Sequence, residues 1–261
     1  MKSILLCEGE TDQILLSYYF INQFHFGFSK EHTKKAGSFA QTGTINSYIQ
    51  SIDLTGKEEN EIAMWAVGGR EKLQLALEVI LELNRVNADL FFERIIIVAD
   101  KDSDVESSLF WEEISQAITK HNIKIQFKEN EWFAGKQKSG FNESKSISFL
   151  ALNIPSEGEG ALETFLLNAL KEQGKAEKYL ALKSEKFVET LVKNRDKFNN
   201  KYLSKRRQCT KAPLAVFFAI TSPDKVFTEM DQMLKSVHWE KYKTIQSGFE
   251  QFNCFSVTKP Q

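Results

Sequence analysis

The sequence contains few of the residues that mark several classes of protein. Its three cysteines, Cys7, Cys209 and Cys254, stand far apart, which is typical of neither a disulfide framework nor a zinc site. The four histidines are scattered and match no zinc-binding spacing. No apolar run approaches the roughly 20 residues of a membrane helix, and no signal-peptide pattern opens the chain. We therefore expect a cytoplasmic protein with no membrane partner.

A phosphate-binding loop of the ATPase type is missing as well. The pattern Gly-x-x-x-x-Gly-Lys-Ser/Thr occurs nowhere in the sequence, so we expect no built-in ATPase. The net charge is only −1, which gives no overall signal for nucleic acid. Basic residues nevertheless gather locally, and one run comprises Lys201, Lys205, Arg206, Arg207 and Lys211. Such a run either binds phosphates or forms a solvated helix face.

Strand-like and helix-like segments alternate through the first half of the chain. Apolar runs predict strands at 2–7, 62–67, 93–99, 122–127 and 146–152, the last of them an edge strand. Helical spacing occupies 11–24, 70–85 and 106–121. This alternation predicts an α/β fold with βαβ units and a mainly parallel sheet of four or five strands.

Other segments are less regular or purely helical. Residues 27–60 read as a long loop with a short helix around 44–52, and 128–146 read as a loop. Beyond Pro155 strand signals stop, and helical patterns occupy about 160–171, 176–194, 196–208, 212–221, 224–236 and 239–252. Pro213 and Pro223 would lie in first helical turns, where proline is tolerated. We expect an α/β domain over 1–152 and an α-helical region over 153–261.

Two acidic clusters, 8–12 and 100–104, each stand where a predicted buried strand ends. In parallel sheets the functional crevice lies beyond the carboxyl ends of the strands. If the two strands are neighbours, Glu8, Asp100 and Asp102 converge. Each like-charged pair at roughly 4 Å then costs about 4 kcal/mol at an effective dielectric near 20. A hard divalent cation such as Mg²⁺ would remove that cost.

At Glu8-Gly9-x-x-Asp12 and Asp100-x-Asp102 the sequence resembles the TOPRIM family. That domain is shared by topoisomerases, bacterial primases, small ribonucleases, recombination mediators and the OLD-type (overcoming lysogenization defect) nucleases. The family pattern is an apolar strand ending in Glu-Gly and, later, an apolar strand ending in Asp-x-Asp. The resemblance covers about residues 1–150 and implies a Rossmann-like TOPRIM domain.

The resemblance also implies roles for individual residues. Asp100 and Asp102 would be metal ligands, and Glu8 would be a ligand or the general acid–base residue. Glu163 would help to hold a second metal, and Lys211 would stabilise charge on a phosphate. The implied cofactor is Mg²⁺ or Mn²⁺, as two ions. The catalytic candidates are thus Glu8, Asp100 and Lys211, and the metal candidates are Glu8, Asp100, Asp102 and Glu163.

The residues alone leave other interpretations of these acids open. The strand-ending acids could be surface residues at loop starts, and Glu163 could be a boundary residue of an amphipathic helix. Asp12 could serve as a ligand, or it could simply be an acid in a first helical turn, where the helix dipole favours negative charge. Glu10 and Asp104 are expected to be solvated.

Glycine-containing turns follow two of the predicted strands. Gly9 would let the backbone approach a metal or phosphate, and Gly68-Gly69 could form either an anion-binding concavity or an ordinary turn. Arg70 would be a phosphate clamp or a surface charge. The expected phosphate-binding set is Gly9, Gly68, Gly69, Arg70, Lys205, Arg206 and Arg207.

The chain is short for a topoisomerase, and its cysteine spacing disfavours the zinc module of a primase. We expect a metal-dependent phosphodiesterase that cleaves DNA or RNA, similar to standalone prokaryotic TOPRIM proteins. It is also similar to the nuclease subunit that some phage-defence systems pair with a separate ATPase, so we expect the effector of a phage-defence or repair system. The alternatives are a non-catalytic regulatory or binding module that partners an ATPase, and a nucleotidyl transferase. A homo-oligomer also stays open.

Overall fold

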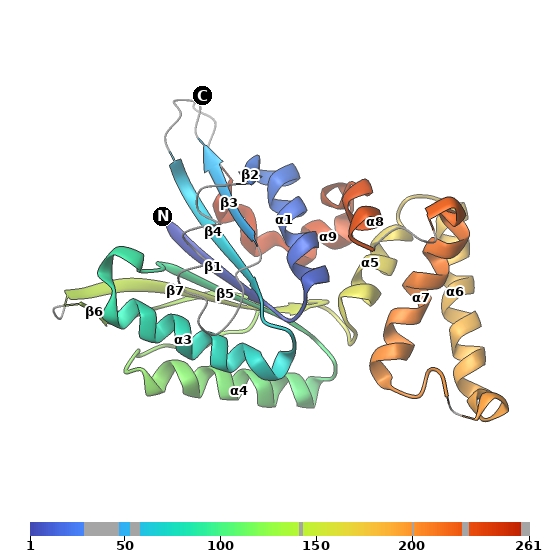
Figure 1. The fold of residues 1–261 in the computed structure, drawn as a ribbon, viewed down its shortest axis with the longest axis horizontal. Helices are drawn as coiled ribbons and strands as arrows, with labels where there is room; N and C mark the ends of the chain where they lie inside the picture. Colours follow the sequence, from blue (N-terminus) through green and yellow to red (C-terminus); the bar gives the residue numbers. More distant parts are fainter. Residues whose placement is uncertain (29–46, 53–57, 141–142, 200, 226–229, 257–261) are drawn as a thin grey trace.

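The computed structural model describes residues 1–28, 47–52, 58–140, 143–199, 201–225 and 230–256. These residues form one seven-stranded sheet in the order β2-β3-β4-β1-β5-β7-β6, with helices on both faces (Figure 1). The α/β fold class predicted from the sequence is confirmed.

Four parallel strands form the centre of the sheet. They are β4 (Glu58–Ala66), β1 (Lys2–Cys7), β5 (Arg94–Asp100) and β7 (Glu143–Ile154). The register pairs Cys7 with Ala66 on one side and with Val98 on the other, so these strands end near one another. Their apolar runs are buried because helices cover both faces of the sheet.

Antiparallel strands at the two edges extend this parallel centre. β2 (Phe26–Phe28) and β3 (Ser47–Ile52) lie beyond β4, and β6 (Trp132–Ser139) lies beyond β7. The predicted short helix at 44–52 is therefore wrong for 47–52, and 44–46 lie outside the described residues. The predicted strand at 122–127 is also wrong, since those residues form no strand.

β6 was missed because its sequence is polar. Its buried polar side chains find partners on α3 (Leu73–Val86): Gln137 Nε2 donates to the Leu81 carbonyl and Ser139 Oγ to the Asn84 carbonyl. The Asn84 carbonyl lies in the last turn of α3, where carbonyls lack intrahelical partners, and the Leu81 carbonyl can accept a second bond through its other lone pair. Because β6 occupies the edge, β7 is an internal strand, which corrects the prediction of an edge strand at 146–152.

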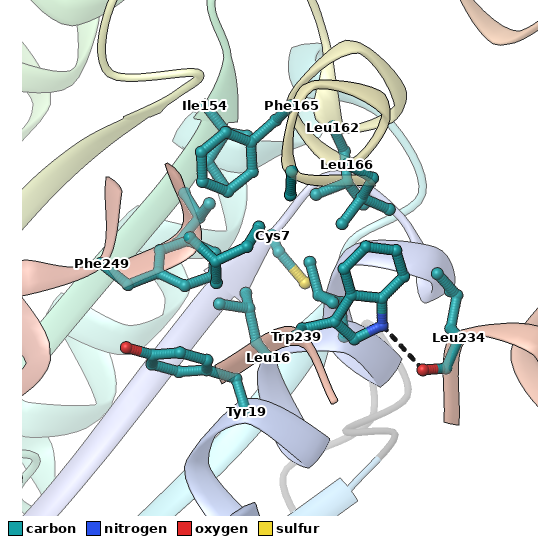
Figure 2. Close-up of a cluster of buried hydrophobic side chains, with 14 of the residues drawn as sticks. Cys7, Leu16, Tyr19, Ile154, Leu162, Phe165, Leu166, Leu234, Trp239 and Phe249 are labelled. Carbon is teal, nitrogen blue, oxygen red and sulfur yellow. Dashed lines mark hydrogen bonds between the residues drawn. The ribbon is translucent and has the colours of Figure 1, made fainter. Parts of the chain in front are cut away.

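Alternate side chains of β1 enter two separate hydrophobic clusters. Ile4 and Leu6 pack with α3 and α4 (Asp104–Lys120) on one face. Leu5 and Cys7 pack on the other face with α1 (Glu10–Phe24) and the C-terminal helices. Figure 2 shows this second cluster around Cys7, whose thiol pKa burial raises well above its ordinary value.

The C-terminal region is helical and shares that second cluster. Its α-helices are α5 (Leu162–Leu170), α6 (Lys175–Lys193), α7 (Arg206–Thr221), α8 (Met230–Ser236) and α9 (Lys243–Gly248). Short 3₁₀ turns are η1 (Arg70–Lys72), η2 (Ala88–Leu90), η3 (Arg195–Phe198), η4 (Pro223–Lys225), η5 (Trp239–Lys241) and η6 (Glu250–Phe255). Phe249 packs edge-to-face against Tyr19 of α1, and Phe252 packs at a tilt against Phe20, so the two predicted regions share one core.

The helices α6 and α7 project from the sheet as a pair (Figure 1). Pro213 lies inside α7, so the predicted boundary between helices at 196–208 and 212–221 is wrong. None of the helices in the described part of the chain is long and apolar enough to cross a bilayer.

Candidate functional site

The two acidic clusters meet at the carboxyl ends of β1 and β5. Glu8 follows β1 directly, and its Oε1 accepts the backbone N–H of Asp100, the last residue of β5, at 2.9 Å. The carbonyl of Glu8 accepts the N–H groups of Gly68 and Gly69 at 2.9 and 2.8 Å. Glu8 thus ties the end of β1 to β5 and to the turn that follows β4.

Asp100 also brings the first C-terminal helix to this edge. Its Oδ1 accepts the N–H of Leu162 in the first turn of α5 at 2.9 Å. The next residue, Glu163, is buried, and its carboxylate forms an ion pair with Lys211 of α7. The partners in these two contacts lie 62 and 48 positions apart in the sequence, so distant parts of the chain meet at the strand ends.

A cavity of about 520 Å³ lies beyond these strand ends. It gathers nearly all of the residues predicted from the sequence: Glu8, Gly9, Gly68, Gly69, Arg70, Asp100, Asp102, Glu163, Arg206, Arg207 and Lys211. Lys205 directly precedes α7 and is not among the described residues that line the cavity. Residues not predicted as site residues line it as well: Glu10, Thr11, Asp12, Glu71, Glu106, Ala161, Leu162 and Thr210.

Three carboxylates at the base of the cavity have raised pKa values. Burial raises the pKa of Glu8 to about 7; the charge of Asp12 adds to this effect, while the Asp100 N–H opposes it. Burial also raises the pKa of Asp100 to about 8, with Glu8 as the next cause. For Asp12 the pKa rises to about 7, through burial first and the charge of Asp100 second. The protein alone therefore does not fully stabilise the charged form of these three carboxylates.

Asp12 belongs more firmly to the site than its sequence position indicated. It lies in the first turn of α1, where an acid is common for dipole reasons alone. Its Oδ2 accepts the N–H of Gly9 at 2.7 Å, and the charges of Asp100 and Glu163 both act on its pKa. In the sequence, only its spacing of four positions from Glu8, within the pattern Glu8-Gly9-x-x-Asp12, indicated this role.

Four basic side chains, Arg70, Arg206, Arg207 and Lys211, also line the cavity. Arg70 Nη1 lies 3.3 Å from Asp102 Oδ2 and from the Asp100 carbonyl, and its guanidinium lies 4.6 Å from the Phe110 ring centre. Arg70 is thus a fixed part of the site and not a free surface charge. Arg206 links α7 to α4, with Nη1 2.8 Å from Glu106 Oε2 and Nη2 3.8 Å from Asp102 Oδ1.

The glycine turn after β4 has a conformation that requires glycine. Gly68 has φ 85° and Gly69 has φ 137°, and a Cβ on Gly69 would lie 2.5 Å from Glu71 Oε1. The N–H groups of both residues donate to Glu8, and that of Gly9 donates to Asp12. In this arrangement none of the three amides is available to bind a phosphate.

The donor set fits a hard divalent cation in its chemistry. Glu8, Asp12 and Asp100 supply carboxylate oxygens, and their raised pKa values show charge that a cation would neutralise. Within the described residues, however, no three side chains from His, Cys, Asp and Glu are placed so that they could hold a metal ion together. Asp102 and Glu163 instead pair with Arg70 and Lys211.

Comparisons with known proteins give a family and a fold. No curated protein matches this chain significantly in sequence. Among solved structures, the crystal structure of a hypothetical protein, PH0156 from Pyrococcus horikoshii OT3, is similar with a TM-score of 0.54 over 97% of each chain. At 13% sequence identity this likeness concerns the fold alone. A family model described as a protein of unknown function, DUF3226, matches residues 2–252, so the chain belongs to the DUF3226 family.

Proposed function

We propose that the cavity is a metal-dependent phosphodiesterase site of the TOPRIM type that acts on DNA or RNA. One observation carries the proposal: Glu8 and Asp100 at adjacent strand ends and Asp12 in the first turn of α1 all have raised pKa values, and they line one cavity together with four basic side chains. Carboxylates alone would repel a phosphodiester. Basic side chains that line the same cavity would let the acids hold a cation while the basic groups hold a phosphate.

The acids would hold Mg²⁺ or Mn²⁺. Glu8, Asp12 and Asp100 are the inner donors, and Asp102 and Glu163 become donors if they leave Arg70 and Lys211. When bound, such a cation polarises a phosphoryl oxygen and neutralises the charge that develops on it.

Glu8 is the candidate for proton transfer. A general acid or base works best when its pKa lies near the working pH, and without a bound cation burial raises the pKa of Glu8 to about 7. This role requires that Asp12 and Asp100 hold the cation and that Glu8 stays unbound, since a bound cation would lower its pKa. Hydrolysis joins a water oxygen to phosphorus and breaks the bond to the leaving sugar oxygen. Glu8 would take the proton of that water.

The basic side chains would hold the substrate. Arg70 is fixed by Asp102 and the Asp100 carbonyl, so a guanidinium is already oriented at the cavity. Lys211, Arg206 and Arg207 approach from α7 and can contact successive phosphates. Stabilising charge on a phosphate in its transition state is the role we assign to Lys211.

Cleavage of plasmid DNA and of single-stranded RNA with Mg²⁺ or Mn²⁺ tests this function. The informative variants are Glu8→Gln and Asp100→Asn, which keep the side-chain size and remove the charge. Glu113→Gln on the exposed face of α4 is the matched control. We expect activity in the wild type and the control and its loss in both site variants. Cleavage that survives both substitutions would refute the proposal.

A regulatory module that partners a separate ATPase is the second candidate. The ion pairs Arg70–Asp102 and Lys211–Glu163 favour it, because they neutralise two of the expected metal ligands without a metal. Cleavage that appears only when an ATPase subunit is added would support this alternative. Incorporation of labelled nucleotide would instead indicate a nucleotidyl transferase.

A further inference from the structure

Positive charge is concentrated in one short part of the chain. Residues 193–199 and 201–211 contain eight lysines and arginines and one aspartate, a net charge of +7 in a chain whose total is −1. They comprise the end of α6, the turn η3 and the beginning of α7. We call this segment the basic tip, because it forms one end of the projecting α6–α7 pair (Figure 1).

Much of this charge has no partner in the protein. Among the described residues, Arg195, Lys197, Lys205 and Arg207 are exposed and have no carboxylate within ion-pairing distance. A solvated helix face usually mixes both signs of charge, whereas here the only acid is Asp196. The basic tip therefore has a positive field that an external polyanion can neutralise.

The basic tip is continuous with the candidate site. Arg206 contacts Glu106 and Asp102, and Arg207 and Lys211 line the cavity. A strand that lies on Arg195, Lys197 and Lys201 therefore has further cations between it and the cavity.

An exposed aromatic side chain lies among these cations. Tyr202 is 58% exposed, the Lys201 Nζ lies 5.2 Å from its ring centre, and the Phe198 ring centre lies 6.5 Å from it. Aromatic rings between basic residues are the elements with which proteins bind unpaired bases and their backbone. In a duplex the bases are already stacked on each other, so this ring has no comparable role there.

We infer that the basic tip binds single-stranded nucleic acid and leads it into the cavity, with Tyr202 stacking on a base. Arg195, Lys197 and Lys201 contact phosphates outside the cavity, and Arg206, Arg207 and Lys211 contact those nearer the acids. This inference deepens the proposed function, because cleavage of the bound strand rests on the proposed phosphodiesterase. Binding of the strand itself requires neither a metal nor cleavage.

Fluorescence anisotropy in EDTA tests the inference, with labelled oligothymidylate and oligouridylate of about 20 nucleotides. The variant Arg195→Gln/Lys197→Gln/Lys201→Gln removes three charges outside the cavity. We expect the affinity of this variant for the oligonucleotides to fall roughly 10- to 100-fold at low salt. The slope of the logarithm of the association constant against the logarithm of the salt concentration should become shallower by about 2, since three phosphate contacts are lost. The matched control is Lys124→Gln/Lys136→Gln/Lys138→Gln, which removes the same charge from exposed residues at the β6 edge.

Tyr202 is tested separately by two substitutions. Tyr202→Ala should weaken binding about 5- to 100-fold through lost stacking, and Tyr202→Phe should retain it. If a duplex of the same length binds as tightly as the single strands and Tyr202→Ala has no effect, the single-strand inference is wrong. If both triple variants lose affinity equally, or neither does, the basic tip is not the binding surface.

These outcomes separate the two proposals. Wild-type protein that binds through the basic tip but cleaves nothing with Mg²⁺ or Mn²⁺ retains this inference and loses the phosphodiesterase. A tip triple variant that both cleaves normally and binds the single strands with wild-type affinity retains the phosphodiesterase and loses this inference.

Discussion

The carboxylate of Glu8 accepts the backbone N–H of Asp100 at 2.9 Å, across 92 positions of the sequence. This bond joins the two acidic motifs and holds the carboxylates of Glu8, Asp12 and Asp100 near one another. Burial is the main cause of their raised pKa values, and the negative charges of neighbouring carboxylates add to it. The predictions below concern this acidic cluster and the side chains around it.

Stability without divalent cations should fall as the pH rises. The pKa values of Glu8, Asp12 and Asp100 are raised in the folded protein to about 7, about 7 and about 8. The folded state therefore binds more protons than the unfolded state above the ordinary carboxyl range, so the free energy of unfolding decreases with pH. The favourable contribution is complete below about pH 4 and is lost as the pH passes through about 7 to 8.

Thermal unfolding in EDTA between about pH 5.5 and pH 8.5 measures this dependence. Asp12→Asn should flatten the curve, since it removes one of the coupled charges, while Glu113→Gln should leave its shape unchanged. A wild-type curve that rises over the same range would contradict the assigned pKa shifts.

Divalent cations should stabilise the protein more at high pH than at low pH. Above the raised pKa values the three carboxylates are charged, so a cation gains more and competes with fewer protons. We expect Mn²⁺ to increase the Tm clearly at about pH 8 and only slightly at about pH 6. Asp100→Asn should abolish the difference, and an equal shift in that variant would place the binding elsewhere.

Removing the partner of Glu163 should destabilise the protein. Lys211→Met leaves the buried Glu163 carboxylate without its ion pair, which should cost about 3 kcal/mol in urea unfolding. The double variant Lys211→Met/Glu163→Gln should recover much of that loss because the buried charge is gone. Mg²⁺ should also restore more stability to Lys211→Met than to the wild type, since Glu163 is then free to bind it.

Gly69→Ala should strain the turn beside Glu8. The residue has φ 137°, and the added Cβ would lie 2.5 Å from Glu71 Oε1, so we expect a loss of about 1 to 3 kcal/mol. Gly27→Ala is the control, because a Cβ there meets no atom within 4 Å. Similar losses in both variants would show that the Gly69 turn is not specially constrained.

The sequence predicted the centre of this molecule because local patterns determine it. Apolar runs that end at Glu8 and Asp100 give buried parallel strands, and adjacent parallel strands bring their carboxyl ends together. The contribution of Asp12 could not be predicted, since its pKa responds to the charges of Glu163 in α5 and Lys211 in α7, which follow more than 140 positions later. The same holds for Arg206 and Glu106, whose contact depends on how α7 packs beside α4.

Two errors in the fold have a common physical cause. β6 is polar, yet Gln137 and Ser139 are buried because carbonyls of α3 accept their hydrogen bonds. Pro213 continues α7 instead of beginning a helix. In both cases tertiary packing overrides a local preference.

A crystal structure with Mn²⁺, examined by anomalous scattering at about pH 8, tests the central claim most directly. The account predicts anomalous density in the cavity between the carboxylates of Glu8, Asp12 and Asp100, and its loss in Asp100→Asn. Anomalous density that is absent from this cavity at saturating Mn²⁺, or that persists unchanged in Asp100→Asn, would contradict it.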